Sequence, residues 1–327
     1  MPEFERPDLA PPGISGELWA AGGKSDEEAG DPKKVRDPSP REFALRCTLR
    51  KHERYSDSIT FDLDPTTGES FLKMPAGRQA KKLGSTLGGL EVHRNSNDQI
   101  SGFSATIRAT SPPEAKSLFL ARLSPLLDFL AYQCDCPLAI DKVLCEDATN
   151  TVFMVGYTSP YPDEIFDFER VTIREQMAPI YALYREAKNS TSAFYRCLCY
   201  YKIMEGVFRH VRPQLFEAAE HDRISIKGAS ERVPDLPEIR KHHPGYIGKK
   251  IKPLFETELT DSYRDEVAHY VLDTGALLNP SDWTTQAKFS SFLFLVETSC
   301  RVVMANQEQL FDQYFSGTPN PTGSKAK

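Results

Sequence analysis

The chain has 327 residues, of which 40% are hydrophobic and 26% are charged, a composition typical of globular proteins with room for two domains. Its formal net charge of −6 excludes a general basic field that would attract nucleic acid, so any such site has to be a local patch. The N-terminus lacks the basic and apolar regions of a signal peptide, and apolar runs such as Ser290–Val296 are too short to span a membrane. We therefore expect a cytoplasmic protein without membrane contact.

The two ends of the chain are rich in Pro, Gly and charged residues. Segments of this composition bury too little apolar surface to offset the entropy that ordering costs. We therefore expect residues 1–40 and 316–327 to be disordered tails.

Between residues 41 and 162 the hydrophobic residues recur with period two, as they do in strands. The run Ser111-Pro112-Pro113-Glu114 has the spacing of a capping box and predicts the start of a helix that continues through Leu130. This region is therefore expected to be an α+β domain, whose role the residues do not disclose. The predicted strands are Phe43–Leu49, Ile59–Leu63, Phe103–Ile107 and Thr151–Tyr157.

From residue 163 to residue 315 the hydrophobic period changes to 3.6, which predicts a bundle of amphipathic helices. Pro160 and Pro162 stand at the change and mark the domain boundary. The segment Arg232–Pro253, with several Pro and Gly residues, is expected to be irregular. The predicted helices are Ile165–Ala187, Ser192–Arg212, Leu259–Leu272 and Asp282–Phe315.

The seven cysteines do not have the spacing of a disulfide framework or of a zinc knuckle. Cys134 and Cys136 form one C-x-C pair, and Cys197 and Cys199 form another, but Cys197 belongs to an apolar helical stripe. We predict reduced core thiols and no metal site, with a four-thiolate zinc site as the alternative. No glycine-rich phosphate loop stands at a strand–helix junction, so we expect no nucleotide cofactor, and nothing else in the sequence indicates one.

Arg264 and His269 stand five residues apart on the helix predicted for Leu259–Leu272. Arginine is a permanent cation that grips phosphate, and histidine can carry a proton at neutral pH. Together they are the smallest set of side chains for acid–base chemistry on an RNA phosphodiester. Helix geometry turns Arg264 toward the bundle interior and places His269 about 140° around the helix from it, toward the rim.

Glu205 lies in the apolar stripe of the helix predicted for Ser192–Arg212. A buried carboxylate is costly unless it is paired, and a buried arginine needs an acid. We therefore predict that Glu205 and Arg264 meet. Two interpretations stay open: a structural ion pair that fixes the helix register, or an acid that orients Arg264 toward a phosphate.

The densest positive charge of the chain lies between Arg240 and Lys250, where two glycines allow backbone amides to approach an anion. This segment is a candidate phosphate- or RNA-binding surface, with a solvated loop as the alternative. The candidate residues are Arg240, Lys241, His242, His243, Lys249 and Lys250.

The C-terminal half resembles a HEPN-type helical bundle. It has a long helix with an embedded acid at Glu205, then Arg264-Asp265-x-x-x-His269, then a terminal helix. The resemblance implies a HEPN-like fold, pairing of two copies through the bundle and contact with RNA. In catalytic members it also implies metal-independent RNA cleavage, with the arginine on the phosphate and the histidine on an oxygen of the phosphodiester.

The stretch Phe194–Lys202, together with the later Arg264-Asp265-x-x-x-His269 helix, is similar to the methylamine utilization protein MauJ family. That resemblance implies an accessory product of gene clusters for methylamine dehydrogenase. Two hypotheses follow from the sequence. The first is a non-enzymatic accessory protein of this kind, with a HEPN-like bundle for dimerisation or RNA contact. The second is a HEPN-type endoribonuclease that uses Arg264 and His269.

Overall fold

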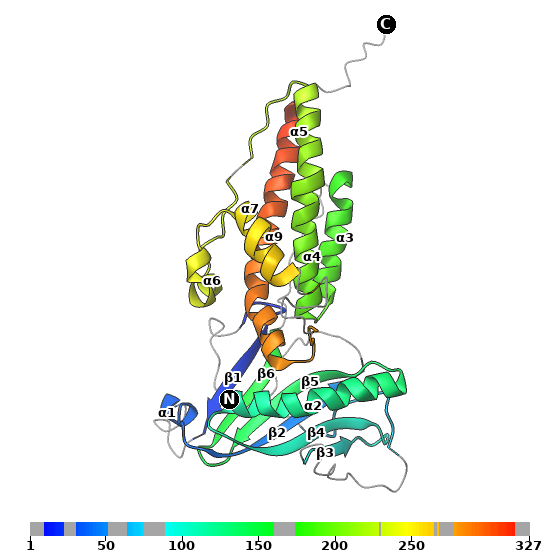
Figure 1. Ribbon diagram of the computed structural model, residues 1–327, viewed down its shortest axis with the longest axis vertical. Helices are drawn as coiled ribbons and strands as arrows, with labels where there is room; N and C mark the ends of the chain where they lie inside the picture. Colours follow the sequence, from blue (N-terminus) through cyan, green and yellow to red (C-terminus); the bar gives the residue numbers. More distant parts are fainter. Residues whose placement is uncertain are drawn as a thin grey trace. The chain divides into compact units, whose positions relative to one another are not determined.

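The structure of the protein is a computed structural model, which describes residues 10–22, 31–51, 64–74, 89–159, 174–228, 230–264, 267 and 277–317. The chain forms two compact units, one of strands with a covering helix and one of helices (Figure 1). The sheet unit comprises Met1–Asp163 and Asn279–Ala287, and the helical unit comprises Glu164–Leu278 and Lys288–Lys327. The mixed fold predicted from the sequence is confirmed, but the return of Asn279–Ala287 to the first unit was not expected.

The sheet unit contains six strands in the order β1-β6-β5-β2-β4-β3, and every neighbouring pair is antiparallel. Three predicted strands are confirmed as β2, β4 and β6, whereas β1, β3 and β5 were not predicted, and the predicted strand Ile59–Leu63 lies outside the described residues. The elements of this unit are β1 (Ser15–Ala21), α1 (Pro32–Val35), β2 (Arg41–Arg50), β3 (Glu91–Arg94), β4 (Ile100–Ala109), α2 (Pro112–Cys134), β5 (Ala139–Asp147) and β6 (Val152–Thr158).

Helix α2 lies across one face of the sheet and closes the core of this unit (Figure 1). Because side chains alternate along a strand, Phe43 and Leu45 of β2 point to the same core although a residue stands between them. Both are fully buried, as are Phe119 and Leu123 of α2. Burial of each such side chain contributes roughly 1.5–3 kcal/mol, so this one face explains why the unit forms.

The start of α2 was predicted correctly. The Ser111 hydroxyl accepts a hydrogen bond from the Glu114 backbone N–H at 3.4 Å, as an N-cap residue does. The Glu114 carboxylate reaches one residue further back than in a capping box, because it accepts from the Thr110 backbone N–H at 2.7 Å.

The expected disordered tail over residues 1–40 is wrong for the part that the structure describes. Strand β1 pairs with β6 from Ser15 opposite Thr158 to Ala21 opposite Val152. Within residues 10–22, only Ile14 and Leu18 are buried hydrophobic residues. The strand is held mainly by backbone hydrogen bonds to its neighbour, which composition does not reveal.

In the helical unit, α3 and α9 run beside one long continuous helix that consists of α4, η5 and α5 (Figure 1). Of the predicted helices, α9 is confirmed, and the helix predicted for Ile165–Ala187 is confirmed as α3 from Ala178 onward. Only the first part of Leu259–Leu272 is described, and it belongs to a π-helical segment, η7. The elements are η4 (Glu175–Met177), α3 (Ala178–Asn189), α4 (Ala193–Gly206), η5 (Val207–Val211), α5 (Arg212–His221), α6 (Pro237–His242), η6 (Pro244–Tyr246), α7 (Ile251–Leu254), η7 (Phe255–Arg264) and α9 (Trp283–Gly317).

The predicted helix end at Arg212 is wrong, because the helix continues through α5 to His221. Pro213 stands in the first turn of α5, directly after the π-helical turn η5. Proline is disfavoured inside a regular helix because it lacks an N–H and clashes with a preceding carbonyl group, and here it follows a turn in which the regular hydrogen-bond pattern is already interrupted.

Among the described residues, no helix is both long enough and apolar enough to cross a bilayer.

Candidate functional site

The helix that carries Glu205 changes its winding directly after this residue. Helix α4 ends at Gly206, the π-helical turn η5 covers Val207–Val211, and α5 continues from Arg212. A π-helical turn contains an extra residue and occurs often at functional sites. Glu205 therefore stands where the regular helix is interrupted.

A second π-helical segment, η7, packs against α4 at the same level. The ring of Phe255, at its start, stacks on Tyr201 of α4 with a centroid distance of 4.7 Å and lies 5.4 Å from the ring of Phe208 in η5. The Thr260 hydroxyl donates to the Phe255 carbonyl oxygen at 2.8 Å, and the hydroxyl oxygens of Thr260 and Tyr201 are 3.2 Å apart. An aromatic cluster thus joins the two π-helical segments.

Two cations bond to the Glu205 carboxylate, and a third acts on it through its charge. The carboxylate accepts hydrogen bonds from Lys202 Nζ at 2.8 Å and from Arg209 Nη1 at 3.0 Å. Burial raises the pKa of Glu205, but the hydrogen bond from Lys202 and the charges of Lys202, Arg209 and Arg264 outweigh this effect and lower it. Glu205 is therefore ionised at neutral pH, in a setting with more positive than negative charge.

Arg264 is half-buried at the end of η7. The central carbon of its guanidinium group lies 5.7 Å from the centroid of the Tyr201 ring, within the range of a cation–π contact. Arg264 also lines a cavity of about 10 Å³, together with Cys197, Leu198, Tyr201, Leu259 and Val296. A cavity of this volume has room for about one water molecule.

The predicted contact between Glu205 and Arg264 stays a prediction. The ion pairs of Glu205 are with Lys202 and Arg209, three residues before it and four residues after it on the same continuous helix. Arg264 acts on Glu205 through its charge, and it is the weakest of the causes that lower the pKa. Asp265 and His269 lie outside the described residues.

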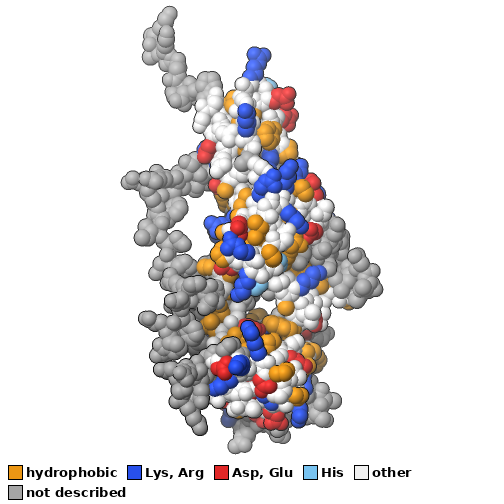
Figure 2. Space-filling model, turned by 90° about the vertical axis from the view of Figure 1, so that its left-hand side faces the viewer, with side chains coloured by type: hydrophobic (Ala, Val, Ile, Leu, Met, Phe, Trp, Pro, Cys, Tyr) orange, Lys and Arg blue, Asp and Glu red, His pale blue; other side chains and the backbone are white. Residues whose placement is uncertain are grey.

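The predicted phosphate-binding residues lie on α6 and on the turn that follows it. Arg240, Lys241, Lys249 and Lys250 are all exposed. Arg240 forms an exposed ion pair with Asp235 at 2.9 Å. Figure 2 shows the side of the helical unit that carries α6, where Lys and Arg side chains gather among hydrophobic ones.

The two histidines of this segment differ in their surroundings. The Nε2–H group of His243 donates to the Ser291 carbonyl oxygen of α9 at 2.7 Å, and its ring meets Phe292 edge-on at 5.3 Å. Partial burial lowers the pKa of His242, and the charge of Lys241 lowers it further. His243 therefore holds the segment to the bundle, whereas His242 is neutral at pH 7 and adds no positive charge.

These residues belong to the segment Arg232–Lys252, which we call the basic segment. A buried cluster of hydrogen bonds around Glu231, the Glu231 clamp, fixes its start. The Glu231 carboxylate accepts from Arg212 Nη1 at 3.1 Å and from Nη2 at 2.6 Å, and from Asn306 Nδ2 at 2.9 Å. Arg212 Nε in turn donates to Gln307 Oε1 at 3.0 Å. Bidentate pairs between charged groups are among the stronger hydrogen-bonded contacts in proteins. These contacts therefore hold α5, α9 and the basic segment together at Glu231.

Sequence reasoning missed a second buried ion cluster in the helical unit. Arg196 of α4 is only 2% exposed, and its Nη2 lies 2.9 Å from Glu297 Oε2 of α9. Lys188 Nζ of α3 lies 2.8 Å from the other oxygen of Glu297. The sequence carried a signal for this cluster, because Arg196 stands between hydrophobic residues of the α4 stripe and Glu297 directly follows Val296.

The prediction of core thiols is confirmed for five cysteines. Burial raises the pKa of the Cys197 thiol to about 12, so this thiol is protonated and unreactive at neutral pH. Cys134 and Cys136 differ, because they lie at the C-terminal end of α2, exposed and half-buried. Within the described ranges, His, Cys, Asp and Glu side chains form no group of three or more that could hold a metal ion. The buried cysteines are Cys47, Cys145, Cys197, Cys199 and Cys300.

Comparison with curated proteins and with solved structures gave no match. Comparison with protein families gave a match over residues 180–305, which is less than half of the chain. The matched stretch starts in α3 and ends in α9. Over these residues the chain is similar to the family described as methylamine utilization protein MauJ.

Proposed function

We propose that this chain is a cytoplasmic accessory protein of methylamine utilization, whose helical unit is a HEPN-like bundle that contacts RNA through the basic segment. The family match over residues 180–305 supports the accessory role. Contact with RNA is supported by the positive charge of the segment Arg232–Lys252. This segment has six Lys and Arg residues against two Asp and Glu residues, in a chain whose net charge is −6. It is the local patch that an acidic chain requires for phosphate contact.

The basic segment is held in one conformation, which favours binding because less entropy is lost. The Val233 backbone N–H donates to the Lys249 carbonyl oxygen at 3.0 Å, and the Gly248 N–H donates to the Val233 carbonyl oxygen at 2.9 Å. Lys241 and Lys250 are exposed, and neither forms an ion pair within the part of the chain that the structure describes. These two cations are therefore the best placed to meet phosphates.

RNA contact is tested by fluorescence anisotropy of the full-length protein with labelled single-stranded RNA at increasing salt. We expect affinity to fall as salt rises, because each neutralised phosphate releases counterions. The double variant K241A/K250A should bind more weakly and flatten the slope of log affinity against log salt by about 1.4, at about 0.7 for each lost contact.

The matched control is R185A/K227A, which removes two exposed cations from the helical unit outside this segment. It should bind RNA as the unchanged protein does. Failure of the unchanged protein to bind at low salt would remove the RNA part of the proposal, and so would equal weakening in both double variants. The accessory role would then be tested on its own, by growth on methylamine after deletion of the gene.

The alternative is a metal-independent endoribonuclease in which Arg264 holds the phosphate, His269 carries the proton and two copies pair through the bundle. Its support is the electrostatic coupling between Arg264 and Glu205, which fits an acid that orients the arginine. Against it, Arg264 is half-buried over Tyr201, and the cavity beside it, at about 10 Å³, is too small for a phosphate. Both observations favour the non-catalytic role.

The endoribonuclease alternative predicts cleavage of single-stranded RNA in the presence of EDTA. His269→Ala should then abolish cleavage, by roughly 10²–10⁴-fold, because the proton carrier is lost. Arg264→Lys should also fail, because an ammonium group cannot reproduce the bidentate grip on phosphate. RNA that stays intact with the unchanged protein at low salt excludes this alternative. Sedimentation analysis tests the pairing of two copies separately.

A further inference from the structure

A pocket in the sheet unit is lined by basic side chains and has no part in the function proposed above. It lies outside residues 180–305, which match the family. It is a shallow hollow, wide open to solvent, with a volume of about 510 Å³. The lining residues are Lys33, Lys34, Arg36, Asp37, Pro38 and Asn150.

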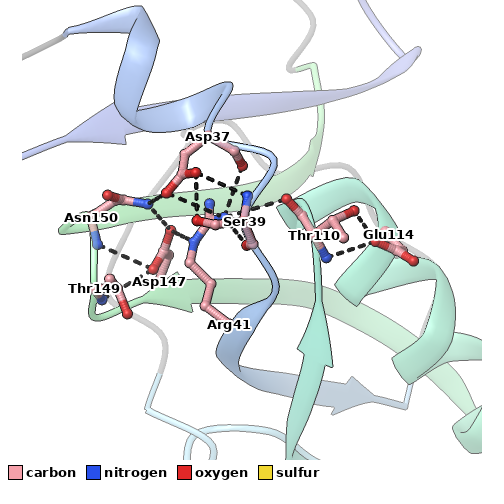
Figure 3. A network of polar contacts seen from close by, with 8 residues as sticks. All are labelled: Asp37, Ser39, Arg41, Thr110, Glu114, Asp147, Thr149 and Asn150. Atoms are coloured by element: carbon pink, nitrogen blue, oxygen red, sulfur yellow. Dashed lines mark hydrogen bonds and ion pairs between the residues drawn. The ribbon is translucent and has the colours of Figure 1, made fainter.

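A buried ion pair fixes the wall of this pocket (Figure 3). Arg41 Nε lies 2.6 Å from Asp147 Oδ2, and Asp147 is fully buried. Arg41 Nη1 also donates to the carbonyl oxygens of Asp37, Ser39 and Thr110. The chain from Asp37 to Ser39 therefore cannot shift without breaking contacts of a buried arginine, and this side of the pocket is held in place.

The one carboxylate at the pocket is engaged within this network (Figure 3). Asp37 Oδ1 accepts from the Ser39 backbone N–H at 2.9 Å and from the Ser39 hydroxyl at 2.5 Å, and Oδ2 accepts from Asn150 Nδ2 at 2.9 Å. The hydrogen bonds from Ser39 and Asn150 lower the pKa of Asp37 to about 2. Asp37 is thus a fixed anion whose two oxygens already have donors, and it leaves the pocket with an excess of positive charge.

Of the three cations at the pocket, one is engaged and two are available. Lys34 Nζ donates to the Gly22 carbonyl oxygen at 2.7 Å. Lys33 and Arg36 are exposed, and neither forms an ion pair with any residue that the structure describes. A guanidinium and an ammonium group beside one concave surface are the usual partners of phosphate oxygens.

We propose that this pocket binds a small phosphate-bearing molecule, with Lys33 and Arg36 on its phosphate group. Arg36 offers two parallel N–H donors to two phosphate oxygens, and Lys33 adds a point charge. The network under Asp37 fixes the backbone on one side of the pocket, so this part needs no reordering on binding. This site is independent of the RNA-contacting segment, because it lies in the other unit and shares no residue with it.

Isothermal titration calorimetry of the full-length protein tests the proposal, with inorganic phosphate and pyrophosphate as probes in chloride buffer of constant ionic strength. Saturable binding is expected for both probes, tighter for pyrophosphate because it carries more charge. The double variant K33A/R36A should lower the affinity by about 100-fold, at about tenfold for each cation removed. Citrate serves as the comparison anion.

The matched control is K73A/R108A, which removes two exposed cations of the sheet unit that do not line the pocket. It should bind pyrophosphate as the unchanged protein does. The proposal is overturned by the absence of saturable binding, by equal losses in the two double variants, or by unchanged affinity in K33A/R36A. Tighter binding of citrate than of pyrophosphate would overturn the phosphate class. Melting curves without ligand show that both variants are folded.

Discussion

Glu297→Gln is the sharpest test of what holds the helical unit together. The Glu297 side chain is 10% exposed and bonds to Arg196 at 2.9 Å and to Lys188 at 2.8 Å. Glutamine keeps the shape of the side chain but removes its charge. The buried Arg196 side chain, which is only 2% exposed, then lacks the negative charge of this carboxylate. Breaking a buried pair in this way costs roughly 3–5 kcal/mol.

Two further variants separate the pair from its surroundings. Arg196→Met leaves Glu297 with Lys188, which is partly exposed, so we expect a smaller loss of about 3 kcal/mol. The double variant R196M/E297L removes both charges and fills the space with apolar atoms. Its loss should be well below the sum of the two single losses, because replacing a buried pair by hydrophobic residues is often nearly neutral.

The assay is urea unfolding followed by the helical circular dichroism signal, analysed as a double-mutant cycle. A strong interaction between the two sites supports the reasoning. Single losses below about 1 kcal/mol that simply add would refute it, because they would mean that the two buried charges do not depend on each other. Lys188→Met is the control, and it should cost less than either change because Lys188 reaches solvent.

Three more predictions follow from the contacts described above. The pKa of Asp37 is about 2 in the folded protein against an ordinary value of 3.8. The ionised carboxylate therefore stabilises the fold fully above pH 3.8, and this stabilisation disappears as the pH falls toward 2. Acid titration of the unfolding free energy should not show this loss of stability in Asp37→Asn. Glu231→Gln removes the charged partner of Arg212. Hydrogen exchange of the backbone amides in residues 232–250 should then be faster by about 100-fold or more. Unchanged exchange rates would contradict the role of Glu231 in fixing this segment. A thiol reagent should modify Cys134 and Cys136 in the native protein and the five buried thiols only after unfolding; rapid native labelling of more than two thiols would contradict this.

The parts of the fold that follow local rules could be predicted from the sequence. The start of α2 at Ser111 follows from its capping residues, and β2 follows from the alternation of Phe43, Leu45 and Cys47. Strand β1 could not be predicted in this way, because its stability comes from pairing with β6, more than a hundred residues later in the chain. Long-range pairing of this kind is absent from any local pattern.

The candidate site was predictable in its residue types but not in its pairings. Helix periodicity drew attention to Glu205 because a carboxylate stood in an apolar stripe, and in the structure it forms ion pairs with Lys202 and Arg209 of the same helix. The π-helical turn after it shifts the register of the following residues, so angles counted at 100° per residue do not carry past Gly206. The same limit applies to Arg264, which ends a second π-helical segment.

The turn η5 also has a consequence for how this helix can vary between related sequences. A π-helical turn holds one residue more than an α-helical turn, and the five residues Val207–Val211 absorb that residue while α4 and α5 continue as one helix. Deleting one residue within η5 would therefore return the stretch to regular winding and leave the buried sides of α4 and α5 aligned. The same deletion within α4 would turn every later side chain by about 100° and expose the core. Single-residue deletions in this helix should thus be found in one turn only, the turn beside Glu205.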